Sequence, residues 1–228
     1  MRQIEVSQAE KIKTLRNNSY FDDLPEEVLE HLARHTQLRE YERGDVLFWE
    51  DDPCAGLHII ESGSIKLYRI SPQGRQYIIS VLSDGETCNE VPAFDGGPNP
   101  VNAEALETCR IWVVNPEILR TLVLSNPEFA LKVLDKFGQR LRTLVAKVSE
   151  MAFYQVTHRL ARLITELPAE GSRLHWTQEQ LAAQLGTVRE VVARSLKELE
   201  KSGAIRIEDR RIHIADNEVL RQWTQPYN

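Results

Sequence analysis

The sequence predicts an α+β protein with three parts in series. These are an N-terminal β-roll of the jelly-roll type, one long amphipathic helix, and a small C-terminal part of paired helices with a two-stranded ribbon. Between residues 41 and 115, β-branched and apolar runs alternate with glycines at roughly ten-residue intervals. After residue 126, apolar residues recur at helical spacing. A capping box and a turn glycine then mark two short helices.

Composition and charge limit the class of protein. The chain has 228 residues, 42% of them hydrophobic and 27% charged, which is ordinary for a globular protein of one or two domains. No apolar run approaches the ~20 residues of a membrane helix, and the N-terminus lacks a signal-peptide core. Cys54, Cys88 and Cys109 are too scattered for a disulfide framework or a metal knuckle. We therefore expect a reduced, cytoplasmic protein with no membrane partner.

The net charge of −6 is unevenly distributed. Residues 151–228 carry 11 basic and 10 acidic side chains, whereas residues 1–150 carry 17 basic and 24 acidic ones. An acidic surface repels nucleic acid, but a part near neutrality can present local positive patches to phosphate. The charge therefore leaves DNA binding open for the C-terminal part.

The N-terminal 40 residues are predicted to be helical. Leu24-Pro25-Glu26-Glu27 is typical of a helix start, because proline fits the first turn and acidic side chains favour the positive end of the helix dipole. An apolar stripe at helical spacing follows at Val28, Leu29 and Leu32.

Five strands are predicted in the β-rich part, over residues 46–49, 57–60, 65–68, 77–82 and 111–114. Ser71 to Gly74 has the composition of a hairpin turn. The segment from Asp95 to Pro100 is expected to be a loop, because two glycines and two prolines stand within it.

Two helix starts follow, Asn115-Pro116-Glu117 and Asn126-Pro127-Glu128, each with asparagine as the cap and proline in the first position. In the second helix, apolar residues alternate at steps of three and four. A helix packed on its own domain needs a similar stripe, but so narrow a seam favours pairing with a second copy. The predicted dimer seam comprises Leu134, Phe137, Leu141, Leu144, Val148 and Met151.

The C-terminal part predicts a winged helix-turn-helix, a DNA-binding motif. After a helix over residues 153–170, Thr177 and Gln180 form a capping box, and Gly186 ends the helix that they begin. A second helix covers residues 189–199, and strands over 203–207 and 211–214 form the wing. The buried side of the second helix is predicted to consist of Val191, Val192, Leu196 and Leu199.

The opposite side of that second helix has the chemistry of base recognition. Arginine can donate two hydrogen bonds to guanine, and glutamate can accept one from cytosine. Such charges on an isolated helix would simply be solvated, but their place just after the turn glycine favours double-stranded DNA as the partner. The predicted DNA contacts are Thr177, Gln178, Thr187, Arg189, Glu190, Arg194, Lys197, Arg210 and Arg211.

The whole chain resembles the cyclic-AMP receptor protein/FNR (CRP/FNR) family of bacterial transcription regulators. The matching segments are Phe21–Pro25, Gly44–Phe48, Gly63–Leu67, Gly85-Glu86, Asn89-Glu90, Ala152–Leu160 and Gly186–Arg194. The resemblance implies a cyclic-nucleotide-binding-like β-roll over residues 1–125, a dimerisation helix over 126–152 and a DNA-binding domain over 153–228. It also implies a homodimer on a two-fold symmetric promoter site, with RNA polymerase as a partner. Arg189, Glu190 and Arg194 match the base-reading positions of the family, which favours a TGTGA-like half-site.

The resemblance further implies an effector pocket, for which the candidates are Cys88, Asn89, Glu90, Pro100, Val101, Leu144 and Val145. Members that bind cyclic AMP use a glutamate for the ribose and an Arg-Ser pair for the phosphate. This chain keeps Glu90 but has Pro100-Val101 at the Arg-Ser positions, and Leu144 and Val145 match an adenine-contacting Thr-Ser pair. A phosphate without charge-assisted hydrogen bonds would lose its hydration uncompensated. We therefore expect no useful affinity for cyclic AMP.

Other effectors stay open. No cysteine precedes Cys54, so the N-terminal iron–sulfur cluster of the FNR branch would have no ligands here. A haem-dependent gas or redox sensor is an alternative, with His58 or Cys88 as the axial ligand, although an ordinary core histidine and a buried cysteine are favoured. A small metabolite, oxidation of Cys88, or no ligand at all are further alternatives.

An enzyme is the competing class, in the form of a cupin-like metalloenzyme. Cupins need clustered ligands, but the strands offer only His58 beside Glu61. His31 and His35 share a helix face without an evident third ligand. No nucleophile elbow, P-loop or paired-carboxylate motif is present, so we expect neither catalytic residues nor a metal.

Overall fold

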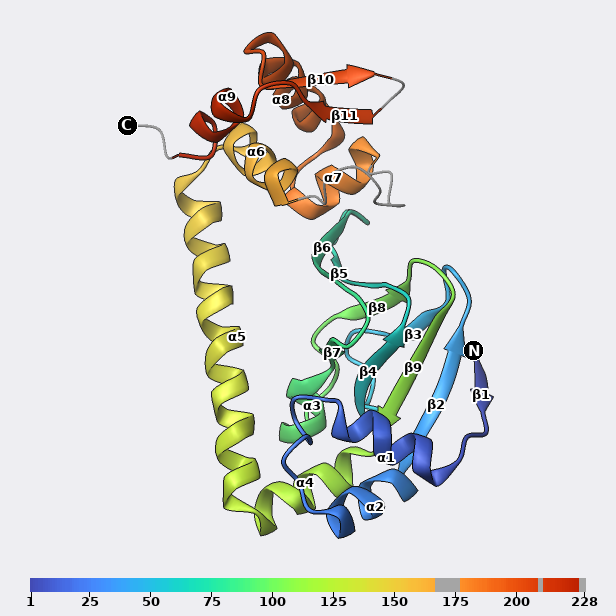
Figure 1. The fold of residues 1–228 in the computed structure, drawn as a ribbon. Coiled ribbons are helices and arrows are strands. Elements are labelled where there is room, and N and C mark those ends of the chain that lie inside the picture. Colours follow the sequence, from blue (N-terminus) through green and yellow to red (C-terminus); the bar gives the residue numbers. More distant parts are fainter. Residues whose placement is uncertain (167–176, 209–210, 226–228) are drawn as a thin grey trace. The chain divides into compact units, whose positions relative to one another are not determined.

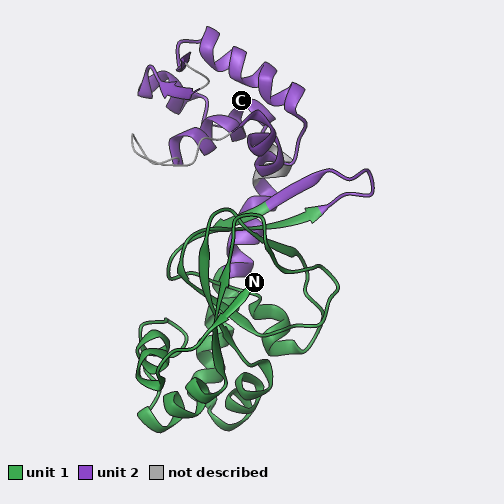
Figure 2. Cartoon of the chain, turned by 90° about the vertical axis from the view of Figure 1, so that its right-hand side faces the viewer, with its two compact units in different colours: residues 1–69, 79–139 green, residues 70–78, 140–228 purple. Residues whose placement is uncertain are grey.

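The computed structural model describes residues 1–166, 177–208 and 211–225, with the side chains of residues 150–153 left out of the description. The chain divides into two compact units, residues 1–69 with 79–139, and residues 70–78 with 140–228 (Figure 2). Each unit is described by itself. None of the helices in the described part of the chain is both long and apolar enough to cross a membrane.

The N-terminal segment is only partly helical. Helices α1 (Gln8–Arg16) and α2 (Glu26–Arg34) are present, and α2 begins directly after Pro25 as predicted. The prediction of helix throughout residues 1–40 is wrong at both ends, because strand β1 (Arg2–Ile4) pairs with strand β2 (Thr36–Tyr41). Thr36 and Leu38 are buried whereas Gln37 is exposed, so β2 has the alternation of a strand. Its polar residues conceal that alternation in the sequence.

Two sheets form the β-roll (Figure 1), which belongs to the first unit except for residues 70–78 at the end of β5 and the start of β6. One has the strand order β1-β2-β9-β4-β7 and the other the order β3-β8-β5-β6. All five predicted strands are confirmed, and β7 and β8 were missed because one has two residues and the other is rich in alanine and asparagine. The strands beyond β2 are β3 (Val46–Phe48), β4 (Leu57–Ser62), β5 (Ile65–Ile70), β6 (Gln76–Leu82), β7 (Thr87–Cys88), β8 (Asn102–Ala105) and β9 (Cys109–Val114).

The predicted turn and loop behave differently. Ser71 to Gly74 is a turn, since Gly74 has a φ of +78° and its N–H donates to the Ser71 carbonyl at 2.8 Å. The predicted loop from Asp95 to Pro100 is shorter than expected. Asp95 ends the short helix α3 (Glu90–Asp95), and Pro98 forms an isolated bridge with Pro53.

Both asparagine caps predicted before the later helices are confirmed. Asn115 Oδ1 accepts from the Glu117 N–H at 2.8 Å, where α4 (Pro116–Ser125) begins. Asn126 Oδ1 accepts from the Phe129 N–H at 3.0 Å, where α5 (Pro127–Phe153) begins. Figure 1 shows α1, α2 and α4 gathered at one end of the sheets. Their apolar faces join Trp112 and Phe129 in one core cluster.

The second unit contains the small C-terminal fold. Leu160, Val192, Leu196 and Leu220 are completely or almost completely buried in its core. Helix α6 begins at Val156, and the end predicted near residue 170 lies outside the described residues. The last helix was not predicted, although Asp216 caps it. The elements are α6 (Val156–Glu166), α7 (Gln178–Leu185), α8 (Arg189–Lys201), β10 (Ile205–Glu208), β11 (Arg211–Ile214) and α9 (Asn217–Gln222).

Candidate nucleic-acid interface

A tight turn joins α7 to α8. The capping box at the start of α7 is present, since Thr177 Oγ1 accepts from the Gln180 N–H at 3.2 Å and Gln180 Oε1 accepts from the Thr177 N–H at 2.8 Å. At its end, Gly186 has a φ of +62°, and the Thr187 N–H donates to the Ala182 carbonyl at 2.9 Å. Glycine adopts this left-handed conformation without the cost that a Cβ would add. The sequence therefore fixes a short connection, and α8 begins three residues after Gly186.

The buried face of α8 fixes its rotation about its own axis. Val192, Leu196 and Leu199 are buried as predicted, whereas Val191 is only partly buried and Ser195 takes a buried place. Thr157 Oγ1 of α6 lies 2.9 Å from Ser195 Oγ and 2.9 Å from Glu198 Oε2. These polar contacts hold α8 against α6 in addition to the apolar packing.

The opposite face of α8 is exposed. It carries Arg189, Glu190, Arg194 and Lys197, which recur at helical spacing. Arg189 Nε lies 3.2 Å from Glu179 Oε1, and both side chains are more than 60% exposed, so the pair contributes little to stability. The other three side chains have no ion pair with any residue that the structure describes. The three predicted base-reading side chains thus share one solvent-facing surface.

The flanking candidates surround this face unequally. Thr177 is exposed, whereas Gln178 and Thr187 are partly buried. Arg211 is exposed at the start of β11, opposite Glu208 in the ribbon. The predicted contact Arg210 lies outside the described residues.

Sequence reasoning missed a further cation in the wing. Arg206 of β10 is exposed, and its Nη1 lies 3.4 Å from Glu208 Oε1. The signal was the alternation of Ile205, Arg206 and Ile207, which points the arginine away from the buried side.

Helix α5 carries an exposed apolar stripe. Phe137, predicted for the dimer seam, instead packs on the core of its own unit, with its ring centroid 5.9 Å from that of Phe94. Met151 lies in α5, but its side chain is outside the described residues. The apolar side chains of α5 that are more than half exposed are Leu131, Leu134, Leu141, Leu144, Val145 and Val148.

Two seven-residue repeats account for five of those six side chains. Leu134, Leu141 and Val148 form one repeat, and Leu131 and Val145 form the other with Gly138 between them. Leu144 lies seven residues after Phe137 and thus on the same side of the helix as that packed ring. The exposed stripe therefore includes Leu131, which the predicted seam omits, and excludes Phe137, which packs on the core.

The candidate effector residues in the β-roll are mostly engaged with protein. Glu90 is buried and its Oε1 accepts from Thr87 Oγ1 at 2.6 Å. Asn89 is buried with a φ of +65°. Pro100 is exposed, and Val101 packs partly buried against the second core cluster.

The inward-facing residue of this loop is Asn99, which the sequence did not indicate. Asn99 is completely buried, Asn89 Nδ2 donates to its Oδ1 at 3.0 Å, and its Nδ2 donates to the Trp49 carbonyl at 3.0 Å. The only cue was an asparagine between two prolines. A cation also lies at the C-terminal end of α3, where Arg120 Nη2 donates to the Pro92 carbonyl at 3.2 Å.

His58 and Cys88 face each other across β4 and β7, and both are completely buried. His58 Nδ1 donates to the Gly56 carbonyl at 2.9 Å, and burial lowers the pKa of His58 to about 4. His58 Nε2 is buried and has no hydrogen-bond partner among the described residues. Burial raises the pKa of the Cys54 thiol. Among the described residues, no three His, Cys, Asp or Glu side chains are arranged to hold a metal ion.

Comparisons with known families match both parts of the chain. Residues 38–126 match the family model of the cyclic nucleotide-binding domain, and residues 158–223 match that of the Crp-like helix-turn-helix domain. The first match covers most of the β-roll. The second begins in α6 and ends at the residue after α9.

Known relatives align over nearly the whole chain. The CRP-like cAMP-activated global transcriptional regulator of Mycobacterium tuberculosis is 28% identical, over 88% of this chain and 93% of its own. The c-di-GMP responsive global regulator CLP of Xanthomonas campestris has a similar fold, with a TM-score of 0.71, 22% identity and coverage of 85% and 100%. So has TTHA1359 of Thermus thermophilus, a CRP/FNR-family regulator, with a TM-score of 0.66, 22% identity and coverage of 82% and 97%.

Proposed function

Because the chain belongs to the CRP/FNR family of transcription regulators and carries its DNA-binding helix-turn-helix, we propose that it binds palindromic promoter sites as a homodimer without control by cyclic AMP. The observation that carries the proposal is the exposed face of α8, which presents Arg189, Glu190 and Arg194 beside a glycine turn.

Each of these side chains has a defined role in the proposal. The guanidinium groups of Arg189 and Arg194 donate to guanine O6 and N7, and the Glu190 carboxylate accepts from cytosine N4. Lys197 and Arg211 contact phosphates, which fix the register without reading sequence. Binding frees Arg189 from Glu179, and this costs little because both side chains are exposed.

The second copy pairs along α5. With Gly138 counted, an apolar stripe has alternating steps of three and four, as a two-stranded coiled coil requires. Its exposed members are Leu131, Leu134, Leu141, Val145 and Val148. Gly138 occupies a position within the stripe, where its lack of a side chain lets the two helices approach closely. The pairing must set two α8 helices about 34 Å apart, so that they enter successive major grooves.

Independence from cyclic AMP rests on the groups around α3. Glu90 and Asn99 already have protein partners, and Pro100 offers neither a cation nor an N–H to a phosphate. The relative from Mycobacterium tuberculosis is cAMP-activated by name. Under the proposal, this chain differs from that relative because it does not bind the phosphate of cyclic AMP.

RNA polymerase is the proposed second partner. The hairpin between β5 and β6 carries exposed residues from Pro72 to Gln76, at the place where family members present a surface loop. Contact there would couple bound DNA to transcription.

The test is anisotropy with the purified full-length protein and a fluorescent palindrome of two TGTGA-like half-sites. We expect tight binding that is unchanged by 1 mM cyclic AMP (roughly a thousandfold above a micromolar affinity), and sedimentation at the mass of a dimer. A monomer, or equal affinity for a scrambled duplex, would refute DNA reading by a dimer. Binding that appears only with cyclic AMP, or a micromolar dissociation constant by calorimetry, would refute the independence alone.

A further inference from the structure

The first unit has a surface groove between α2 and α4, far along the chain from the DNA-binding face. Its volume is about 230 Å³, below the roughly 300–1,000 Å³ of pockets for drug-sized ligands, so it suits only a small molecule. Val28 and Leu32 line it from α2, and Ile118 and Leu122 from α4. The floor is thus apolar, and it lies within one compact unit. The imidazole of His31 also lines the α2 side, where its ring centroid lies 5.3 Å from that of His35.

The polar groups on the α4 side of the groove present acceptors. The Thr121 hydroxyl donates to the Glu117 carbonyl at 2.9 Å, and the Ser125 hydroxyl donates to the Thr121 carbonyl at 2.9 Å. Each hydroxyl has one hydrogen to donate, so both oxygens have only lone pairs left for a ligand.

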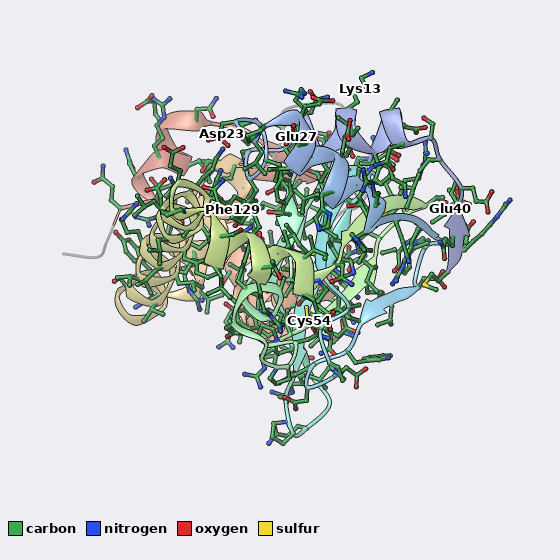
Figure 3. The ribbon with its side chains drawn as sticks, turned by 90° about the horizontal axis from the view of Figure 1, so that it is seen from below. Lys13, Asp23, Glu27, Glu40, Cys54 and Phe129 are labelled. Carbon is green, nitrogen blue, oxygen red and sulfur yellow. The ribbon has the colours of Figure 1, made fainter. Side chains whose placement is uncertain are left out.

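The α2 side adds a negative charge. Glu27, labelled in Figure 3, is exposed and lines the groove. It has no ion pair with any described residue. Its neighbours on the helix differ, since Glu26 pairs with Arg16 and Glu30 lies 3.8 Å from Arg34. The carboxylate that lines the groove is therefore the one whose charge is not neutralised by a neighbour.

These features select one class of ligand. From the apolar floor, the acceptor-only hydroxyls and the unpaired carboxylate we infer that the groove binds a small apolar cation, an aryl-alkyl or alkyl amine. The apolar body contacts the floor, and the ammonium donates to Glu27 and to a hydroxyl oxygen on the opposite wall. The acidic excess of residues 1–150 favours a cation over an anion at this surface.

Methyl NMR of the full-length protein tests the inference, with phenethylamine as the probe. Isoleucine, leucine and valine methyls are labelled, so that Val28, Leu32, Ile118 and Leu122 report directly on the groove. We expect saturable shifts confined to these methyls with phenethylamine, and at least fivefold weaker binding of the anion hydrocinnamate. Absence of saturable shifts at these methyls, or equal affinity for the anion, would overturn the inference.

A pair of variants isolates the charge. Glu27→Gln keeps the shape of the side chain and should weaken phenethylamine binding by about two- to fivefold, the scale of one exposed charge. Glu30→Gln, on the same helix but outside the groove, should leave the affinity unchanged. Equal effects of the two substitutions would mean that general surface charge binds the amine, and the groove assignment would fail. No DNA is present in these measurements, so their outcome is separate from that of the proposed function.

Discussion

Substitution of Arg194 by alanine tests the proposed reading of DNA most directly. The side chain is exposed and has no hydrogen bond or ion pair with any residue in the described part of the chain. Its removal should therefore leave the stability of the fold unchanged within ~0.5 kcal/mol. Any loss of DNA affinity then reports on a contact made only in the complex.

The expected loss has a defined size. A bidentate arginine–guanine contact contributes about 1–3 kcal/mol of discrimination, which corresponds to a five- to 150-fold change in affinity for each half-site. Because the dimer loses one contact in each of two half-sites, the total loss should be about 2–6 kcal/mol. Arg189→Ala should cost slightly less than Arg194→Ala, by at most about 1 kcal/mol for each copy, because Arg189 must first leave Glu179.

The assay is anisotropy titration of Arg194→Ala against the preferred palindrome, the three duplexes with the other base pairs at one position of each half-site, and a scrambled duplex. The loss should be confined to the preferred palindrome, so that the variant no longer distinguishes the base pairs at that position. Lys201→Ala, at the far end of α8, is the matched control and should behave as the unchanged protein. Equal losses on the palindrome and on scrambled DNA would refute a base-reading role.

Three further predictions follow from the same structure. Lys197→Ala should weaken specific and scrambled DNA alike. It should lower the slope of log affinity against log salt by about two, because each dimer loses two phosphate contacts, and titrations at several salt concentrations measure this slope. Loss of discrimination with an unchanged slope would assign Lys197 to the bases instead. Leu141→Glu should weaken dimerisation by roughly 3–6 kcal/mol, because each dimer loses two buried leucines. Sedimentation should find this variant monomeric, whereas the control Leu124→Glu, on α4 and 88% exposed, should remain dimeric. A dimeric Leu141→Glu variant would mean that the two copies pair along another surface. His58 has a folded-state pKa of about 4, below its unfolded value of 6.5. Between these values the unfolded chain binds the extra proton, so the free energy of unfolding should fall by about 3 kcal/mol as the pH drops from 6.5 to 4; urea titrations should find that part of the fall missing in His58→Gln, and an identical pH profile would contradict the burial of a neutral histidine.

Local signals in the sequence predicted the elements whose hydrogen bonds are local. Asn115, Asn126 and Thr177 each cap a helix within three residues of themselves, and Gly186 ends α7 by its own backbone conformation. The helix-turn-helix was therefore predictable almost to the residue. Strands β7 and β8 were not, because two and four residues carry too little pattern, and their pairing partners lie far along the chain.

The site residues that sequence reasoning missed depend on tertiary packing. On α5, the predicted seam that includes Phe137 and the exposed stripe that includes Leu131 both have steps of three and four, so spacing does not distinguish them. Contact of Phe137 with Phe94 determines which side of the helix faces the protein's own core. Asn99 is similar, since its amide is placed by Asn89 and by the Trp49 carbonyl, both distant in sequence. Periodicity in the sequence gives the spacing of apolar residues along a helix. It does not show which face of that helix packs against the rest of the protein.

The hydrogen bonds that join Thr157 of α6 to Ser195 and Glu198 of α8 have a consequence for protein engineering. They hold α8 through atoms that lie away from Arg189, Glu190 and Arg194. Positions 189, 190 and 194 can therefore be randomised together without disturbing the packing of α8. Selection from such a library should yield regulators that bind new operators.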